Sequence, residues 1–189
     1  KWHSPEGNIS LSLAFADREL DSPISIATGI LVKDALSEVF NLDTIKLKWP
    51  NDLVFENKKI GGILVEKEVY ANFTKTIVGI GINLELDKKE SWWGDFKDLN
   101  GKNLRDKIIN KILMKFEILF RDRLEDWKSL WNQSCIHNEA IISVARNNET
   151  IKGKYLGVND AGELLLENEK GNIISFSSGE VSIKGIYNK

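Results

Sequence analysis

The sequence contains little cysteine, no long apolar run and almost no net charge. Its single cysteine, Cys135, excludes an internal disulfide framework and is interpreted as a small core residue rather than a nucleophile. No run of about 18 or more apolar residues is present, so no membrane-spanning helix is predicted. A net charge of −2 argues against a nucleic-acid-binding surface, which needs a basic excess.

The first residues lack an initiator methionine and the apolar block of a signal peptide. A strand-like pattern begins almost at once. We therefore expect a cytoplasmic protein, and we expect that these 189 residues begin inside a longer chain.

Several catalytic patterns are absent as well. His3 and His137 stand far apart without the Cys or carboxylate spacing of a metal site, so each is interpreted as a surface or hydrogen-bonded residue, and no metal ligand is predicted. No Ser-His-Asp arrangement can be argued. Gly79 and Gly81 lack the third glycine and the following helix of a dinucleotide-binding fingerprint. They indicate either a plain strand with small residues or a flat slot for a planar or apolar ligand.

Alternation and helical spacing divide the rest of the chain into elements. Polar–apolar alternation and turn signals predict strands at residues 8–15, 44–49, 53–55, 60–70 and 76–86. The last three, joined by short turns, indicate an antiparallel meander. Apolar residues at helical spacing predict one helix from residue 24 to Asn41 and one over residues 104–131, capped by Asn103.

The composition shifts near residue 139, where short strand-like runs alternate with turn dipeptides. Such spacing over about 50 residues predicts a small barrel of the size of an SH3-like fold. We therefore expect a first domain over residues 1–136, incomplete at its N-terminal side, and a second over residues 137–189.

The most informative segment covers residues 48–66, KWPNDLVFENKKIGGILVE. Alternation over residues 44–49 places Lys46 and Lys48 on one face of a strand. Pro50 ends this strand, and Asn51 and Asp52 offer the side-chain-to-backbone bonds of a turn. Because an ammonium group resists leaving water unless an anion meets it, Lys48 predicts an anionic ligand at the end of a sheet.

The motifs KWPND, KIGGILVE and GIGINL, in this order and close together, resemble the catalytic domain of biotin protein ligases. The opening KWHSPEGNISLSL is similar to the segment after that family's arginine-rich adenylate-binding loop, which is not in this chain. GVNDAGELLLE and SSGEVSIKG resemble the family's small C-terminal domain. The resemblance implies an α+β fold, with a mixed or antiparallel sheet like that of class II aminoacyl-tRNA synthetases, flanked by helices and followed by an SH3-like β-barrel.

The resemblance also implies a two-step ligase reaction. Biotin and Mg-ATP would give biotinyl-5′-adenylate, and a lysine of a biotin carrier domain of a carboxylase would then take the biotin. The implied ligands are thus biotin, ATP and Mg²⁺, and the implied protein partner is the carrier domain. Association of two copies into a homodimer is left undecided, because the predicted sheet has exposed edge strands that could pair. No membrane partner is expected. Nucleic acid is expected as a partner only if a winged-helix domain lies upstream.

The resemblance assigns roles to individual residues. Lys48 matches the family lysine that contacts the biotin carboxylate and the α-phosphate, and it is the expected catalytic residue. Trp2 and Asn83 match the positions that receive the adenine, by stacking and by amide hydrogen bonding. The positions that match the biotin slot are Leu53, Gly62, Gly79, Gly81 and Ile82. The turn that supports Lys48 consists of Trp49, Pro50, Asn51 and Asp52.

Two alternatives remain open at this point. One is a biotin-responsive transcriptional regulator that uses the same site as a sensor, which would need an upstream DNA-binding domain. The other is a lipoate or octanoate transferase of the same catalytic fold, which the KWPND turn and the SH3-like tail disfavour.

Overall fold

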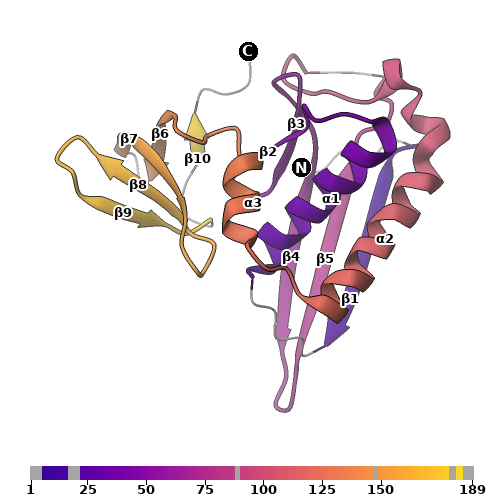
Figure 1. The fold of residues 1–189 in the computed structure, drawn as a ribbon, viewed down its shortest axis with the longest axis horizontal. Coiled ribbons are helices and arrows are strands. Elements are labelled where there is room, and N and C mark those ends of the chain that lie inside the picture. Colours follow the sequence, from indigo (N-terminus) through magenta and orange to yellow (C-terminus); the bar gives the residue numbers. More distant parts are fainter. Residues whose placement is uncertain (1–5, 17–21, 88–89, 147–148, 179–181, 185–189) are drawn as a thin grey trace.

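The computed structural model describes residues 6–16, 22–87, 90–146, 149–178 and 182–184. They form a mixed α+β fold with two antiparallel sheets (Figure 1). No described helix is both long and apolar enough to cross a lipid bilayer.

The first sheet contains five strands in the order β1-β5-β4-β3-β2, and each neighbouring pair is antiparallel. The strands are β1 (Ile9–Ala16), β2 (Lys46–Lys48), β3 (Asp52–Phe55), β4 (Lys58–Val69) and β5 (Thr74–Ile82). The predicted meander of the last three is confirmed. Strand β1 pairs with β5, so the N-terminal strand forms one edge and the short β2 forms the other.

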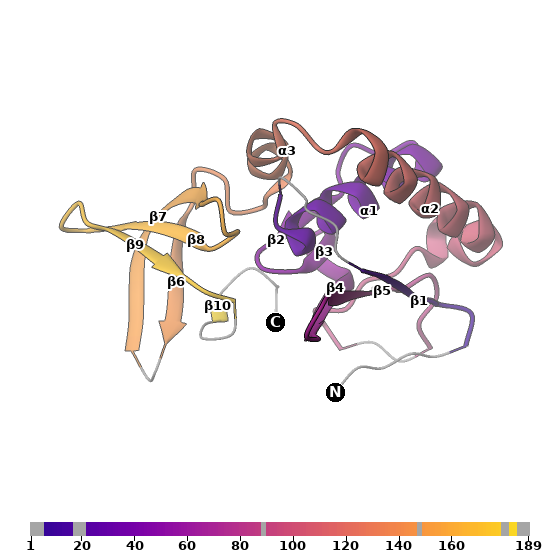
Figure 2. The same cartoon turned by 90° about the horizontal axis from the view of Figure 1, so that it is seen from below.

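Two helices lie on the same face of this sheet (Figures 1 and 2). Helix α1 (Ile24–Phe40) buries most of its residues between the sheet and α2 (Arg105–Asp122). Helix α1 ends where the sequence predicts, because Asn41 adopts a left-handed conformation with a φ of 54°. None of the helices in the described part of the chain covers the opposite face of the sheet (Figure 2).

The predicted single helix over residues 104–131 is wrong. The chain forms α2 and then α3 (Trp127–Ser134), because Arg123 and Asp126 have φ values of 62° and 52°, outside the helical region. The prediction that Asn103 caps the helix is also wrong. Asn103 lies in a 3₁₀ turn, Gly101–Leu104, and its amide donates to the Asn100 side chain at 2.7 Å.

The second sheet follows α3 and has the strand order β10-β6-β7-β8-β9, again antiparallel throughout. Its strands are β6 (Ile141–Arg146), β7 (Glu149–Val158), β8 (Leu164–Asn168), β9 (Ile173–Phe176) and β10 (Ser182–Lys184). Its buried hydrophobic residues are Ile142, Val144, Tyr155, Val158, Leu164, Leu166 and Phe176.

The two sheets are joined by buried side chains and by the chain itself. The indole N–H of Trp49, at the end of β2, donates to the carbonyl of Gly162 in the β7–β8 turn region at 3.0 Å. The indole N–H of Trp131, on α3, donates to the Tyr155 hydroxyl on β7 at 2.9 Å. The segment after α3 therefore connects two sheets that also touch directly near the KWPND turn.

Candidate functional site

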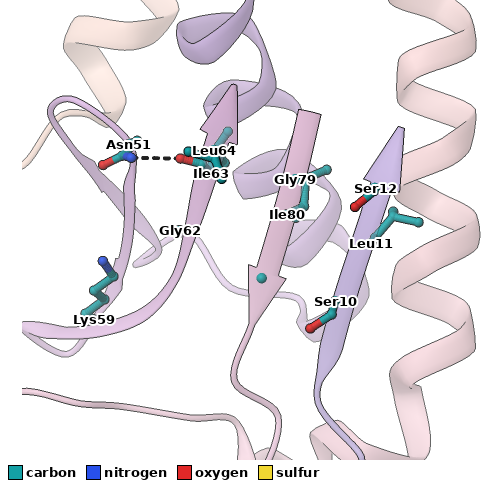
Figure 3. A pocket seen from close by; sticks show the side chains of 11 residues that line it. Ser10, Leu11, Ser12, Asn51, Lys59, Gly62, Ile63, Leu64, Gly79 and Ile80 are labelled. Atoms are coloured by element: carbon teal, nitrogen blue, oxygen red, sulfur yellow. Dashed lines mark hydrogen bonds between the residues drawn. The ribbon is translucent and has the colours of Figure 1, made fainter. Parts of the chain in front are cut away.

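A pocket of about 410 Å³ lies on the first sheet (Figure 3). Strands β1, β4 and β5 form its floor, and the KWPND turn lies at one side. The described residues that line it are Ser10, Leu11, Ser12, Asn51, Lys59, Gly62, Ile63, Leu64, Gly79, Ile80 and Gly81.

The pocket opens on the face that the helices do not cover. Ile63 and Ile80 have their side chains buried in the core shared with the helices. Because side chains alternate along a strand, Gly62 and Leu64 point to the opposite face, and Leu64 is 59% exposed there. The pocket therefore has a sheet as its floor, and no helix of the described residues lies over it.

Glycines give this floor its flat shape. The strand register places Gly62 opposite Gly81, and Gly81 opposite Ser10. In the next row on this face, Gly79 lies between Leu64 and Ser12. Gly79 and Gly81 could indicate either a plain strand or a flat slot for a ligand. The structure favours the slot, because small residues from adjacent strands lie side by side.

The same row continues to the predicted catalytic lysine. Gly62 is opposite Asp52 on β3, and Asp52 is opposite Lys48 on β2. The row from Ser10 to Lys48 thus crosses all five strands. Lys48 lies at its far end and is only 9% exposed.

Leu53 and Ile82, two of the predicted slot residues, do not line the pocket. Both are buried in the core, in the row that contains Gly61. They lie beneath the floor and not on its open face. The structure therefore brings Gly62, Gly79 and Gly81 into the pocket but leaves these two side chains in the core.

An ion-pair cluster stands beside the pocket. The Asp52 carboxylate lies 4.0 Å from the Lys48 ammonium and forms a closer ion pair with Lys59. Burial lowers the pKa of Lys48, Asp52 acts in the opposite direction, and Lys59 lowers it further. The cation predicted from sequence is therefore present, but it is held by a carboxylate of its own motif.

The turn that carries Lys48 is fixed to its neighbours on both sides. The Asn51 side chain donates to the carbonyl of Ile63 at 2.7 Å, and the Ile63 amide donates back to the Asn51 carbonyl at 2.9 Å. Trp49 is buried and precedes Pro50 through a cis peptide bond. The turn has the side-chain-to-backbone bond expected of it, with Asn51 reaching across to β4.

Asn83, a predicted adenine contact, follows β5 and is bonded within the protein. Its side-chain amide donates to the carbonyl of Gly94 at 3.0 Å, and its backbone amide donates to Ile60 at 2.7 Å. Gly94 in turn donates to the carbonyl of Lys59. Asn83 therefore holds the segment around Gly94 against β4. Trp2, the other predicted adenine contact, lies outside the described residues.

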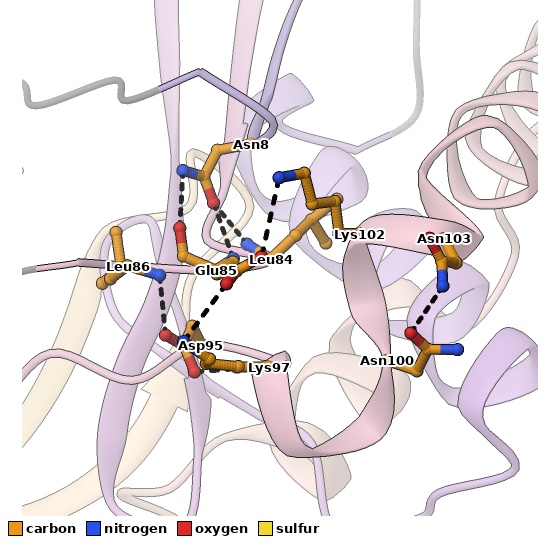
Figure 4. A network of polar contacts seen from close by, with 9 residues as sticks. All are labelled: Asn8, Leu84, Glu85, Leu86, Asp95, Lys97, Asn100, Lys102 and Asn103. Carbon is orange, nitrogen blue, oxygen red and sulfur yellow. Dashed lines mark hydrogen bonds and ion pairs between the residues drawn. The ribbon is translucent and has the colours of Figure 1, made fainter.

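Asn8 fixes the chain that continues from Asn83 (Figure 4). Its side-chain oxygen accepts from the amides of Leu84 and Glu85 at 2.6 and 3.0 Å, and its amide donates to the Glu85 carbonyl at 3.0 Å. Asp95 accepts from the Leu86 amide at 2.8 Å. This role of Asn8 was not predicted, because its only signal in the sequence is a polar residue at the start of a strand.

Lys59 was missed as well. The strand predicted from the sequence begins only at residue 60, whereas Lys59 is the second residue of β4, contacts Asp52 and lines the pocket. The run Lys58-Lys59 was a signal of positive charge, but it could not tell which lysine faces the site.

The interpretation of His137 as a surface or hydrogen-bonded residue is wrong. Its side chain is fully buried, with its ring centroid 5.9 Å from that of Tyr155, and neither ring nitrogen has a hydrogen-bond partner among the described residues. Burial, reinforced by the charge of Lys48, lowers the pKa of His137 from 6.5 to about 4. Cys135 is buried nearby, and burial raises the pKa of its thiol, as befits a core residue.

We expect His137 to make folding sensitive to acid. Because its pKa is lower in the folded state, its contribution to stability is present above pH 6.5 and is lost as the pH falls toward 4. At a pKa difference of this size the loss amounts to about 3 kcal/mol. Urea unfolding between pH 7 and pH 4 measures how the free energy of unfolding falls with pH. This fall should be smaller for His137→Phe than for the unmodified protein. Parallel declines would contradict the prediction.

Comparison with known proteins adds to this geometry. Residues 1–83 match the Biotin/lipoate A/B protein ligase family, and residues 140–184 match the Biotin protein ligase C terminal domain. The chain is 30% identical to the Bifunctional ligase/repressor BirA of Bacillus spizizenii, over 90% of this chain and 57% of that protein. It is 26% identical to the protein of the same name from Escherichia coli, over 97% of this chain and 61% of that protein.

Among solved structures, the chain resembles the biotin protein ligase of Aquifex aeolicus in complex with biotin and ATP. The TM-score is 0.73 at 25% identity, and the match covers 97% of this chain and 81% of that one. The chain thus spans about three fifths of the length of the curated BirA relatives. Two family matches in the expected order and a shared fold agree with the motifs around Lys48, and the chain belongs to the biotin protein ligase family.

Proposed function

We propose that this chain is part of an enzyme that activates biotin with ATP and transfers it to a lysine of a biotin carrier domain. The observation that carries the proposal is the row that runs from the glycine floor of the pocket through Asp52 to Lys48. A flat, mainly apolar slot suits a compact ring system, and a cation at its end suits the carboxylate of that ligand.

Charge explains what Lys48 would contribute to the first step. A biotin carboxylate oxygen attacks the α-phosphorus of ATP, the bond from that phosphorus to the bridging oxygen breaks, and pyrophosphate leaves. Two anions must approach each other for this to happen. A fixed ammonium group between them stabilises the charge that gathers in the transition state. The carrier lysine then attacks the acyl carbon, and AMP leaves.

Mg²⁺ enters this proposal as the ion of Mg-ATP. Among the described residues, no three His, Cys, Asp or Glu side chains are grouped closely enough to hold a metal ion. Asp52, the carboxylate in the row of the pocket, is ion-paired with Lys48 and Lys59. Because Mg²⁺ is often held by few carboxylates together with substrate phosphates, we assign it no ligand from this chain.

We also propose the finer architecture. The first sheet with α1 and α2 corresponds to a catalytic domain over residues 1–136, of the kind found in class II aminoacyl-tRNA synthetases. The second sheet corresponds to an SH3-like barrel within residues 137–189. The match of residues 140–184 to the Biotin protein ligase C terminal domain supports this division. Asn83 and Trp2 are proposed to receive the adenine.

The ligase proposal is tested on the complete protein with radiolabelled biotin, Mg-ATP and a biotin carrier domain. Label should appear on the carrier, and its absence would refute the proposal. Because the matched family includes lipoate ligases, calorimetry should compare biotin with lipoate. Binding of lipoate in preference to biotin would favour the transferase alternative.

The slot itself can be tested with two glycines on neighbouring strands. A Cβ at Gly79 would meet Leu64 Cβ at an ordinary 3.7 Å, whereas a Cβ at Gly61 would overlap the Gly81 carbonyl oxygen. We expect Gly79→Ala to keep the stability within about 0.5 kcal/mol but to weaken biotin binding roughly tenfold. Gly61→Ala should instead cost about 1–3 kcal/mol of stability.

Thermal unfolding and biotin calorimetry measure both effects for each variant. Unchanged biotin affinity in Gly79→Ala would show that the ligand does not lie on this floor. The Gly61→Ala variant tests whether β4 and β5 can move apart to make room for a Cβ beside the Gly81 carbonyl oxygen.

Transcriptional regulation is a second candidate, because the relatives named above are ligase/repressors. Residues 1–189 have a net charge of −2 and give no support for a DNA-binding surface. Biotin-dependent retention of the complete protein on DNA would be the supporting result. We propose the ligase alone for the residues described.

A further inference from the structure

Lys59 is the one charged side chain among the described residues that line the pocket. The other lining residues are glycines, serines, aliphatic residues and Asn51. Figure 3 shows the Lys59 side chain beside the pocket on the same side as Asn51. Its side chain keeps 27% of its surface exposed, more than the 11% of Lys48. Lys59 is therefore the more accessible of the two ammonium groups near Asp52.

The three charges beside the pocket do not cancel. Lys48 and Lys59 both form ion pairs with Asp52, so these three side chains together carry one more positive charge than negative charge. Partly buried charge is costly unless a counter-charge is near. This small cluster therefore favours the arrival of an anion, and Lys59 is the member that the anion can reach from the pocket.

The backbone of Lys59 is fixed on its outer side. Its amide donates to the carbonyl of Trp92 at 2.9 Å, and its carbonyl accepts from Gly94 at 2.9 Å. The Asn83 side chain holds Gly94 in place. A cation whose backbone is already held in position loses less on binding than one on a free loop. Only the side chain of Lys59 has to move in order to exchange Asp52 for another anion.

We propose that Lys59 is a second anion-binding residue of this pocket. When the nucleotide binds, the Lys59 ammonium leaves its ion pair with Asp52 and contacts the phosphate. The inference rests on the proposed function and extends it, because two lysines, Lys48 and Lys59, then supply the positive charge that faces the bound anions. Asp52 competes with the phosphate for Lys59, so the two residues have opposite effects on nucleotide binding.

The test is calorimetric titration of the complete protein with AMP at saturating biotin and low salt. Lys59→Met should weaken AMP binding about tenfold or more, the loss expected for one charge-assisted hydrogen bond. Lys59→Arg should restore most of it, and Asp52→Asn should tighten AMP binding. The matched control is Lys58→Met, since Lys58 is exposed at the neighbouring position and does not line the pocket.

A purely structural role for Lys59 gives a different result. If Lys59 only neutralises Asp52, Lys59→Met lowers the unfolding temperature and leaves AMP affinity equal to that of Lys58→Met. That outcome overturns the inference, as does weaker AMP binding in Asp52→Asn. Biotin transfer by the unmodified protein separates the two proposals. Transfer with unchanged AMP binding in Lys59→Met refutes only the role of Lys59, whereas the predicted AMP changes without any transfer refute only the ligase.

Discussion

Replacing Lys48 with methionine is expected to slow the formation of biotinyl-5′-adenylate about 10²–10³-fold, the cost of removing one fixed group that stabilises a transition-state charge. Methionine keeps an apolar stem in a site that is only 9% exposed, so no large cavity opens. The loss should fall on the chemical step more than on biotin binding. The carboxylate and the phosphate are forced together only as the reaction proceeds.

Two measurements separate these effects. Biotin-dependent exchange of labelled pyrophosphate into ATP reports adenylate formation, and calorimetry reports the biotin dissociation constant. Lys46→Met is the matched control, because Lys46 lies on the same strand but its ammonium bonds to the carbonyl of Gln133 at 3.4 Å. Equal losses in adenylate formation and in biotin binding would refute the role assigned to Lys48.

The strands around this site could be predicted because their side chains alternate. Small or polar residues in β1, such as Ser10 and Ser12, face the pocket, while Leu11 packs against the core. The position of Lys48 near Asp52 also follows from sequence, because a tight turn returns the chain after four residues. Local sequence patterns were therefore sufficient to predict Lys48, the turn that follows it and the glycines that form the floor of the pocket.

The features that could not be predicted from the sequence depend on contacts between distant segments or on unusual backbone angles. Arg123 is not of a residue type that favours positive φ, and the modest preference of Asp126 for it does not by itself predict a break between two helices. Lys59 and Asp52 meet because the register of β3 and β4 shifts between Leu53 and Val54. Alternation alone cannot predict such a bulge.

The second large effect is expected at Trp49, the residue next to Lys48. Trp49 is 2% exposed, and its indole N–H donates to the carbonyl of Gly162, between β7 and β8 of the second sheet. Trp49→Ala should cost about 3–5 kcal/mol of stability, because a large buried ring leaves a cavity. Trp49→Phe keeps most of the volume and leaves the Gly162 carbonyl without this donor, at a cost of about 1–3 kcal/mol.

Urea unfolding gives the free energies, with Trp92→Phe as the control because Trp92 is half-buried in the segment beside β4. If Trp49→Phe lost no more stability than Trp92→Phe, the bond to Gly162 would not stabilise the protein. The rate of adenylate formation and the biotin affinity should also be measured for Trp49→Phe. The turn that holds Lys48 is attached to β4 by Asn51 and to the second sheet by Trp49. A loss of rate at unchanged biotin affinity would therefore mean that the second sheet helps to position Lys48 for the reaction.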